Sequence, residues 1–126
     1  MEGELDYREK LKIKMDSYVH RVYAVTRNFP KEELYGAVSQ LRRAALSVIL
    51  NFVEGYARKV NGNEASYRYF LNISYGSLKE SKYLIDFSLV EKFISKDAHR
   101  ELVTLADEIG AMLYCIKGFI INEKLK

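Results

Sequence analysis

A line of polar side chains in the middle of the chain has the residue types and spacing most suited to chemistry. Arg43, Ser47, Asn51, Glu54 and Arg58 follow one another at spacings of four and three residues, so on a helix neighbouring side chains would meet. Three interpretations stay open. Glu54 pairs with Arg58 on a solvated helix face, or Asn51 and Glu54 lie at a subunit boundary and set its register, or the arginines bind phosphate.

The phosphate-binding interpretation depends on a group of basic residues around this line. The candidate nucleic-acid contacts are Arg42, Arg43, Arg58, Lys59 and Arg68. Repeated around an assembly, such a patch would hold RNA or DNA through several simultaneous phosphate contacts, with little sequence preference. The whole chain has 20 Lys or Arg and 17 Asp or Glu, a net charge of +3, which excludes a strongly basic nucleic-acid arm.

No arrangement of residues in the sequence specifies a reaction. Neither His20 nor His99 has an acidic residue three positions before it, as a carboxylate-bridged di-iron bundle requires, and there is no phosphate-cradling glycine loop. The single cysteine, Cys115, excludes an intramolecular disulfide, fits a reducing cytoplasm and is interpreted as a packed thiol. We therefore predict no enzymatic activity, no metal site and no cofactor.

The elements that must position these residues are four predicted helices, at 7–28, 31–58, 64–89 and 96–121. One proline and seven glycines in 126 residues argue against an all-β fold, and 48% apolar residues suffice for a core. Phe29-Pro30 ends the first helix, Val60-Asn61-Gly62-Asn63 forms a turn, and Ser95 is an N-cap. The prediction is an all-α, up-down-up-down antiparallel four-helix bundle in a single domain, 1–126.

Each predicted helix carries a core stripe of mostly apolar residues at spacings of four and three. The stripes are Leu11, Met15, Tyr18, Val22, Val25 and Phe29; Leu34, Val38, Leu41, Ala45, Val48 and Phe52; Tyr67, Leu71, Ser74, Leu78, Ser81 and Ile85; and Leu102, Ala106, Ile109, Leu113, Ile116 and Ile120. The N-terminus shows no signal peptide, and the longest nearly apolar run, 44–53, is about half a membrane span. No membrane partner is expected.

Two helices have more apolar surface than a bundle core needs. Self-association explains this excess, and the candidate interface residues are Tyr35, Leu46, Ile49, Leu50, Val53, Asn51 and Glu54 on the second helix and Tyr69, Tyr83 and Phe87 on the third. The alternative is an unevenly packed monomer in which the second helix is enclosed on two sides by its own partners.

An ordered set of motifs along nearly the whole chain resembles one bacterial family. The motifs are Phe29-Pro30-Lys31-Glu32-Glu33-Leu34-Tyr35-Gly36, Ser39-Gln40-Leu41-Arg42-Arg43-Ala44-Ala45, Asn51, Glu54-Gly55, Arg58, Phe70-Leu71 and Gly76-Ser77-Leu78-Lys79-Glu80. They are similar to those of the four-helix bundle family also called 23S rRNA intervening-sequence proteins. The resemblance implies a small cytoplasmic protein that assembles as a ring, a homopentamer, with no established enzymatic activity.

The family is in turn similar to the accessory proteins of diversity-generating retroelements, which are pentameric barrels that bind nucleic acid and a reverse transcriptase. The chain departs from the family's pattern at one place. Where the family often has a proline in the second helix, this chain reads Ser47-Val48-Ile49-Leu50-Asn51. Without that proline we expect a straighter second helix.

These observations lead to two main functional hypotheses. The first is a non-enzymatic, ring-forming four-helix bundle scaffold that binds RNA or DNA electrostatically. The second is a protein-protein adaptor that docks a partner helix on Tyr69, Tyr83 and Phe87. An enzyme of unrecognised type is a third, which a metal or cofactor bound to the purified protein would support.

Overall fold

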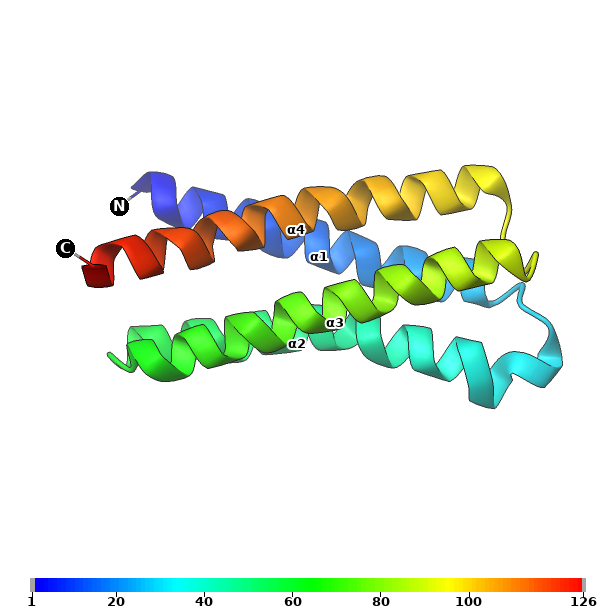
Figure 1. Cartoon of the computed structure of the whole chain (residues 1–126), viewed down its shortest axis with the longest axis horizontal. Coiled ribbons are helices and arrows are strands. Elements are labelled where there is room, and N and C mark those ends of the chain that lie inside the picture. Colours follow the sequence, from blue (N-terminus) through cyan, green and yellow to red (C-terminus); the bar gives the residue numbers. More distant parts are fainter. Residues whose placement is uncertain (1, 126) are drawn as a thin grey trace.

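The computed structural model describes the backbone of residues 2–125 and the side chains of residues 7–118. Four long helices, α1 (Glu2–Thr26), α2 (Ser39–Val60), α3 (Glu64–Val90) and α4 (Lys96–Leu125), run side by side, and consecutive helices reverse direction (Figure 1). Both ends of the described chain lie at the same end of the molecule. Residues 2–125 contain no strand. The all-α four-helix fold expected from the sequence is confirmed.

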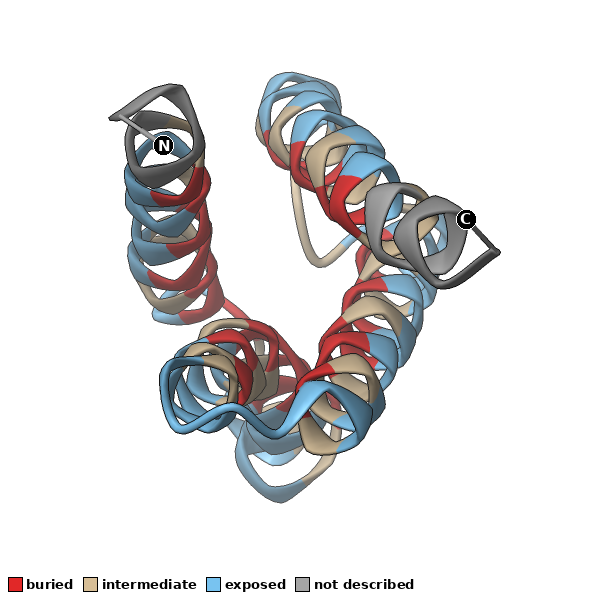
Figure 2. Cartoon of the chain, turned by 90° about the vertical axis from the view of Figure 1, so that its left-hand side faces the viewer, coloured by how far each residue is buried: buried red, intermediate tan, exposed pale blue. Residues whose placement is uncertain are grey.

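The core lies along the inward faces of the four helices, where the buried residues gather (Figure 2). Every residue of the stripe predicted for α3 is buried, and so is the stripe of α4 as far as Ile116. Val25 is only half-buried, and the side chain of Ile120 lies outside the described residues. The stripes are accurate because a 3.6-residue period leaves a regular helix only one way to turn its apolar face inward.

The prediction fails at the start of the second helix, which does not run continuously from Lys31. A 3-10 turn, η1 (Lys31–Glu33), and a π turn, η2 (Leu34–Val38), precede α2, and Gly36 has non-helical angles (φ −111°, ψ −109°). A π turn holds an extra residue, so residues before it are rotated away from the stripe of α2. Leu34, predicted to be in the core, is 49% exposed for this reason. Beyond η2, α2 is unbroken through 47–51.

Short capped connections join the later helices. Gly62 has φ +83° in the turn after α2, and the side chain of Asn63 accepts a hydrogen bond from Ser66 N at 3.0 Å to start α3. Ser95 caps α4 by accepting a hydrogen bond from Ala98 N at 3.1 Å, as predicted. Lys92, between α3 and α4, is a non-glycine residue with φ +64°.

The helices α2 and α3 form the most extensive contact between any two elements. Small residues allow their close approach. Ser74 Oγ on α3 donates a hydrogen bond to Val48 O on α2 at 2.6 Å, and a Cβ atom on Gly55 would lie 3.1 Å from Phe70 Cβ. A side chain at Gly55 would therefore require Phe70 to shift by a few tenths of an ångström.

Among the residues that the structure describes, no helix is both long enough and apolar enough to cross a lipid bilayer.

Candidate functional site

The polar line predicted on α2 faces α3 over part of its length. Ser47 Oγ lies 2.7 Å from Ser77 Oγ on α3, and Asn51 Nδ2 donates to Ser47 O and Ser47 Oγ at 2.8 and 2.9 Å. All three residues are partly or fully buried. Their polar atoms are therefore used within the chain, where they fix the register of α2 against α3.

The arginines at the edges of this line are held by carboxylates of the same chain. Arg43 pairs with Glu80 and donates to Gln40 Oε1 at 3.0 Å. Arg58 pairs with Glu54 at 2.5 Å, as one interpretation of the sequence predicted, and its guanidinium lies over the ring of Phe70. These ion pairs are exposed, where each contributes less than about 1 kcal/mol to stability and where a phosphate can compete for the arginine.

Arg42 lies against the end of α1 and not among the other basic residues. Its Nε donates to Thr26 Oγ1 at 2.8 Å, its Nη2 donates to Tyr23 O at 3.4 Å, and its guanidinium lies 4.5 Å from the centroid of the Tyr23 ring. Thr26 Oγ1 also donates to Tyr23 O, at 3.2 Å, so Arg42 and Thr26 share this carbonyl near the end of α1. Arg42 is thus a half-buried side chain whose donors bind the protein itself.

The remaining basic candidates gather at the turn between α2 and α3. The ammonium group of Lys59 lies 5.4 Å from the centroid of the Tyr67 ring, and Arg68 follows Tyr67 on α3. Arg68 Nε is buried and has no hydrogen-bond partner among the described residues. Arg43 lies about 22 Å along α2 from Arg58, so the five predicted contacts do not form one patch.

The candidate interface residues on α2 leave an apolar strip exposed. Leu46 is 37%, Leu50 57% and Val53 46% exposed, and Ile49 is partly buried against the core. The strip continues to the end of the helix at spacings of four and three residues. We call it the α2 seam; it consists of Leu46, Leu50, Val53, Ala57 and Val60, all exposed. Tyr35 is 90% exposed but lies in η2, outside this seam.

A second exposed strip follows α3. Tyr69, Gly76, Tyr83 and Val90 recur every seven residues and are all exposed, and we call them the α3 seam. Phe87, beside this seam, is 40% exposed and packs at its edge against Phe93. Coiled-coil helices use strips with this repeat to pack on one another.

Each of the two histidines lies beside a carboxylate of the same chain. His20 lies 3.4 Å from Asp16 on α1, and His99 Nε2 lies 2.8 Å from Asp86 Oδ1 across the α3–α4 connection. Among the described residues, no three His, Cys, Asp or Glu side chains lie close enough to hold a metal ion. Cys115 is exposed, so its interpretation as a packed thiol is wrong.

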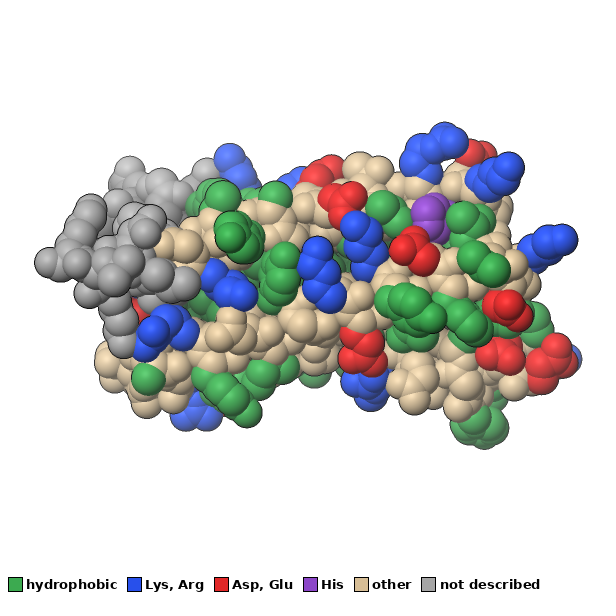
Figure 3. Space-filling view, viewed as in Figure 1, with side chains coloured by type: hydrophobic (Ala, Val, Ile, Leu, Met, Phe, Trp, Pro, Cys, Tyr) green, Lys and Arg blue, Asp and Glu red, His purple; other side chains and the backbone are tan. Residues whose placement is uncertain are grey.

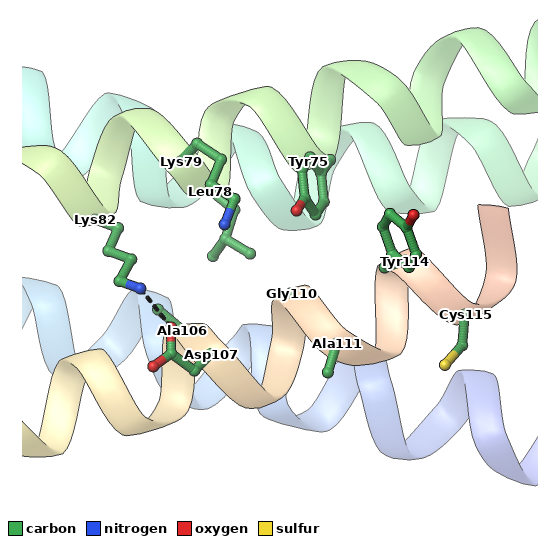
Figure 4. A pocket seen from close by; sticks show the side chains of 10 residues that line it. All are labelled: Tyr75, Leu78, Lys79, Lys82, Ala106, Asp107, Gly110, Ala111, Tyr114 and Cys115. Carbon is green, nitrogen blue, oxygen red and sulfur yellow. Dashed lines mark hydrogen bonds and ion pairs between the residues drawn. The ribbon is translucent and has the colours of Figure 1, made fainter. Parts of the chain in front are cut away.

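Sequence analysis missed an open groove between α3 and α4, of about 370 Å³ (Figure 4). Its lining includes Tyr75, Lys79 and Lys82 from α3 and Tyr114 and Cys115 from α4. These residues lie off the core stripes and far apart in sequence, so no local spacing brings them together. We call it the α3–α4 groove.

Comparison with known proteins identifies the chain's relatives. Residues 9–115 match the family model described as 23S rRNA-intervening sequence protein. The chain belongs to the 23S rRNA-intervening sequence protein family. The family expected from the sequence motifs is thereby confirmed.

A solved structure from Bacteroides thetaiotaomicron shares the fold of this 23S rRNA-intervening sequence protein. It is described as a protein with unknown function from the S23 ribosomal protein family, and it superposes with a TM-score of 0.80 at 18% sequence identity. The match covers 89% of this chain and 98% of that chain. No curated protein compared with this family member matches it. Neither description names a reaction.

Proposed function

We propose that this protein is a non-enzymatic scaffold that assembles with copies of itself into a ring. The observation that carries the proposal is the pair of exposed seams on different helices. Burying a Leu or Val side chain stabilises a complex by roughly 1.5–3 kcal/mol. Burial of the two exposed strips would therefore favour association of the chains. If the α2 seam of one copy packs on the α3 seam of the next, the contact is heterologous, and repeated heterologous contacts close into rings.

The proposed ring is a homopentamer, because the family resemblance supports that number. The family is also similar to the accessory proteins of diversity-generating retroelements. Those proteins are pentameric barrels, so this similarity supports the same number of subunits for the proposed ring. We place the assembly in the cytoplasm, the reducing compartment that a single exposed cysteine suits.

Nucleic acid is the proposed cargo of the ring. Each chain carries a net charge of +3, which a pentamer multiplies fivefold, and Arg58, Lys59 and Arg68 lie near one another at the α2–α3 turn. A ring repeats this basic cluster at regular intervals, so one RNA or DNA strand can contact several copies at once. Such binding depends on salt and carries little sequence preference.

The particle mass in light scattering tests the ring. The unmodified chain is expected near five times 14.6 kDa, and Leu50→Glu, which places a charge on the α2 seam, is expected near one times that mass. Ile13→Glu is the matched control, because Ile13 is 58% exposed on α1, outside both seams. A monomeric wild-type chain, or a Leu50→Glu particle of undiminished mass, rejects the proposal.

Binding of a short single-stranded RNA tests the cargo. The affinity should fall steeply between low and high salt, and charge reversal by Arg58→Glu should weaken binding about tenfold or more. Charge reversal at Arg42 is not informative, because the donors of Arg42 bind α1 and the substitution would change the stability of the fold as well as RNA binding. Binding that ignores salt, or that survives both Arg58→Glu and Arg43→Glu, contradicts this site.

The exposed aromatic residues of α3 favour a second candidate, a protein-protein adaptor. Tyr69 and Tyr83 are 61% and 67% exposed, and with Phe87 they form an apolar face suited to a partner helix. Binding of a partner protein on this face would be insensitive to salt and lost in Tyr83→Ala. A salt-sensitive complex that survives Tyr83→Ala rejects the adaptor.

A further inference from the structure

The α3–α4 groove owes its space to small residues on α4. Ala106, Gly110 and Ala111 line it, and a Cβ atom on Gly110 would already lie 3.4 Å from Leu78 Cδ2 across the groove. Its volume of about 370 Å³ falls at the lower end of the range for small-molecule sites, which is roughly 300–1,000 Å³. The groove shares no residue with the α2 seam or the α3 seam, and Lys79 lies beside the α3 seam, one helical turn from Gly76 and from Tyr83.

Two lysines lie beside the ring of Tyr75, which lines this groove. Lys79 is also a lining residue, and Lys117 lies next to the groove on α4. The ammonium groups of Lys79 and Lys117 lie 5.2 and 4.6 Å from the centroid of the Tyr75 ring. Cation–π attraction holds each charge in place, although the two like charges repel each other. Neither lysine pairs with a carboxylate in the part of the chain that the structure describes, and an anion between them would neutralise both.

Lys82, the other lysine of the groove, is paired with a carboxylate, unlike Lys79 and Lys117. Lys82 Nζ lies 2.6 Å from Asp107 Oδ1 and closes one end of the groove (Figure 4). The hydrogen bond from Lys82 to Asp107 raises the pKa of Lys82. Figure 3 shows basic side chains gathered along the boundary between α3 and α4 on this face. The positive potential is therefore concentrated on the Tyr75 side of the groove.

The wall beside these charges is aromatic. Tyr114 projects from α4 toward the Tyr75 side of the groove and is 66% exposed (Figure 4). An exposed tyrosine face is a platform on which a planar base can stack. A ligand that uses both features has to combine a planar ring with a phosphate.

We propose that the α3–α4 groove binds a nucleoside phosphate unit, with the phosphate between Lys79 and Lys117 and the base against Tyr114. A free nucleotide and one nucleotide of a single strand present the same chemistry here. Binding of a strand rests on the proposed nucleic-acid function, whereas binding of a free nucleotide does not. The groove lies apart from Arg58 and Lys59, so it is a second contact and not part of that basic cluster.

Cys115 lies at the margin of the groove, with its side chain directed away from Tyr75 and Tyr114, and its reactivity reports a ligand that covers this end (Figure 4). It is the single cysteine of the chain, it is exposed, and it lines the groove. The experiment measures the rate at which a thiol reagent modifies Cys115 in the full chain, with adenosine 5′-monophosphate, a short single-stranded RNA, adenosine or inorganic phosphate. The monophosphate or the RNA should slow modification in a saturable way, and adenosine or phosphate alone should need much higher concentrations.

Matched variants separate the groove from general charge effects. Lys117→Gln should weaken protection about tenfold, because it removes a charge-assisted contact to the phosphate, and Tyr114→Leu should weaken nucleotide binding more than phosphate binding. Lys96→Gln removes the same charge from an exposed position at the other end of α4 and should leave protection unchanged.

The outcomes distinguish this site from the proposed function. Protection by the monophosphate alone supports the groove as a nucleotide site without supporting RNA binding. RNA that binds but leaves Cys115 unprotected, with no protection by the monophosphate, overturns the groove and leaves the proposed function intact. The groove is also rejected if Lys117→Gln and Lys96→Gln behave alike.

Discussion

At the scale of single residues, burial decides what a side chain can do. The hydroxyl of Tyr18 lies 2.7 Å from Ser81 Oγ between α1 and α3, and the Tyr18 side chain is fully buried. Loss of solvent around Tyr18 raises its pKa to about 12, although the hydrogen bond with Ser81 lowers the pKa in part. Tyr18 therefore stays protonated in the folded chain at pH values where an exposed tyrosine ionises.

The shifted pKa of Tyr18 predicts a loss of stability at alkaline pH. Tyrosine in the unfolded chain has a pKa near 10, so above this pH the unfolded state loses its proton first and the folded state is disfavoured. Between pH 9 and 11, urea unfolding of the wild type should lose about 1 kcal/mol more than unfolding of Tyr18→Phe. Tyr83→Phe, at an exposed position, should keep the wild-type slope. Equal slopes for wild type and Tyr18→Phe would show that burial does not shift this pKa.

At the scale of elements, the connections carry local strain that the helices do not. The chain turns from α3 into α4 through Lys92 N, which donates to Leu89 O at 3.0 Å, and Phe93 N, which donates to Ser88 O at 2.8 Å. These bonds satisfy carbonyls at the end of α3 and require a left-handed backbone at Lys92. For a residue with a Cβ atom, that conformation costs roughly 1–2 kcal/mol.

Replacing Lys92 with glycine is therefore expected to stabilise the chain. Lys92→Gly removes the steric cost but increases the entropy of the unfolded state, so the net gain should be up to about 1 kcal/mol in urea unfolding. Glu91→Gly is the matched control, because Glu91 has φ −77° and gains nothing from glycine. Glu91→Gly should lower stability. A decrease for both variants would contradict strain at Lys92.

At the scale of the whole molecule, the exposed surface is divided into parts that serve different contacts. The α2 seam and the α3 seam are apolar, whereas the α3–α4 groove and the α2–α3 turn concentrate basic groups. Apolar association is far less sensitive to salt than phosphate binding. The assembly and its nucleic-acid binding should therefore respond differently to salt.

Mixing two variants tests which seam meets which. Leu50→Glu damages the α2 seam, Tyr83→Glu damages the α3 seam, and in a heterologous ring each variant alone should be monomeric. An equimolar mixture should form dimers through the two intact seams, because the α2 seam of one variant can pack on the α3 seam of the other. Light scattering distinguishes these masses. Dimers of Tyr83→Glu alone would instead indicate that two α2 seams pack together.

The sequence by itself determined the elements of this protein. The helix bounds other than the start of the second helix, the cap at Ser95 and nearly all core positions follow from short-range patterns, because helix periodicity and capping depend on residues within a few positions of each other. Val25 is only half-buried, and Leu34 is exposed because the π turn at Gly36 changes the number of residues per turn and rotates Leu34 outward. The residue pattern of the second helix also indicated an unusually wide apolar surface, and part of that surface is the exposed α2 seam.

Only the tertiary structure decided how the polar and basic residues are used. Arg42 was grouped with phosphate contacts, but packing of α1 beside α2 places Thr26 and Tyr23 at its guanidinium. Lys79 and Lys117 belong to different helices, and the packing of α3 beside α4 brings both ammonium groups close to the ring of Tyr75. The physical reason is common to both cases. Which partner a long charged side chain meets depends on which helices pack together and in what register. The packing of the apolar core sets both.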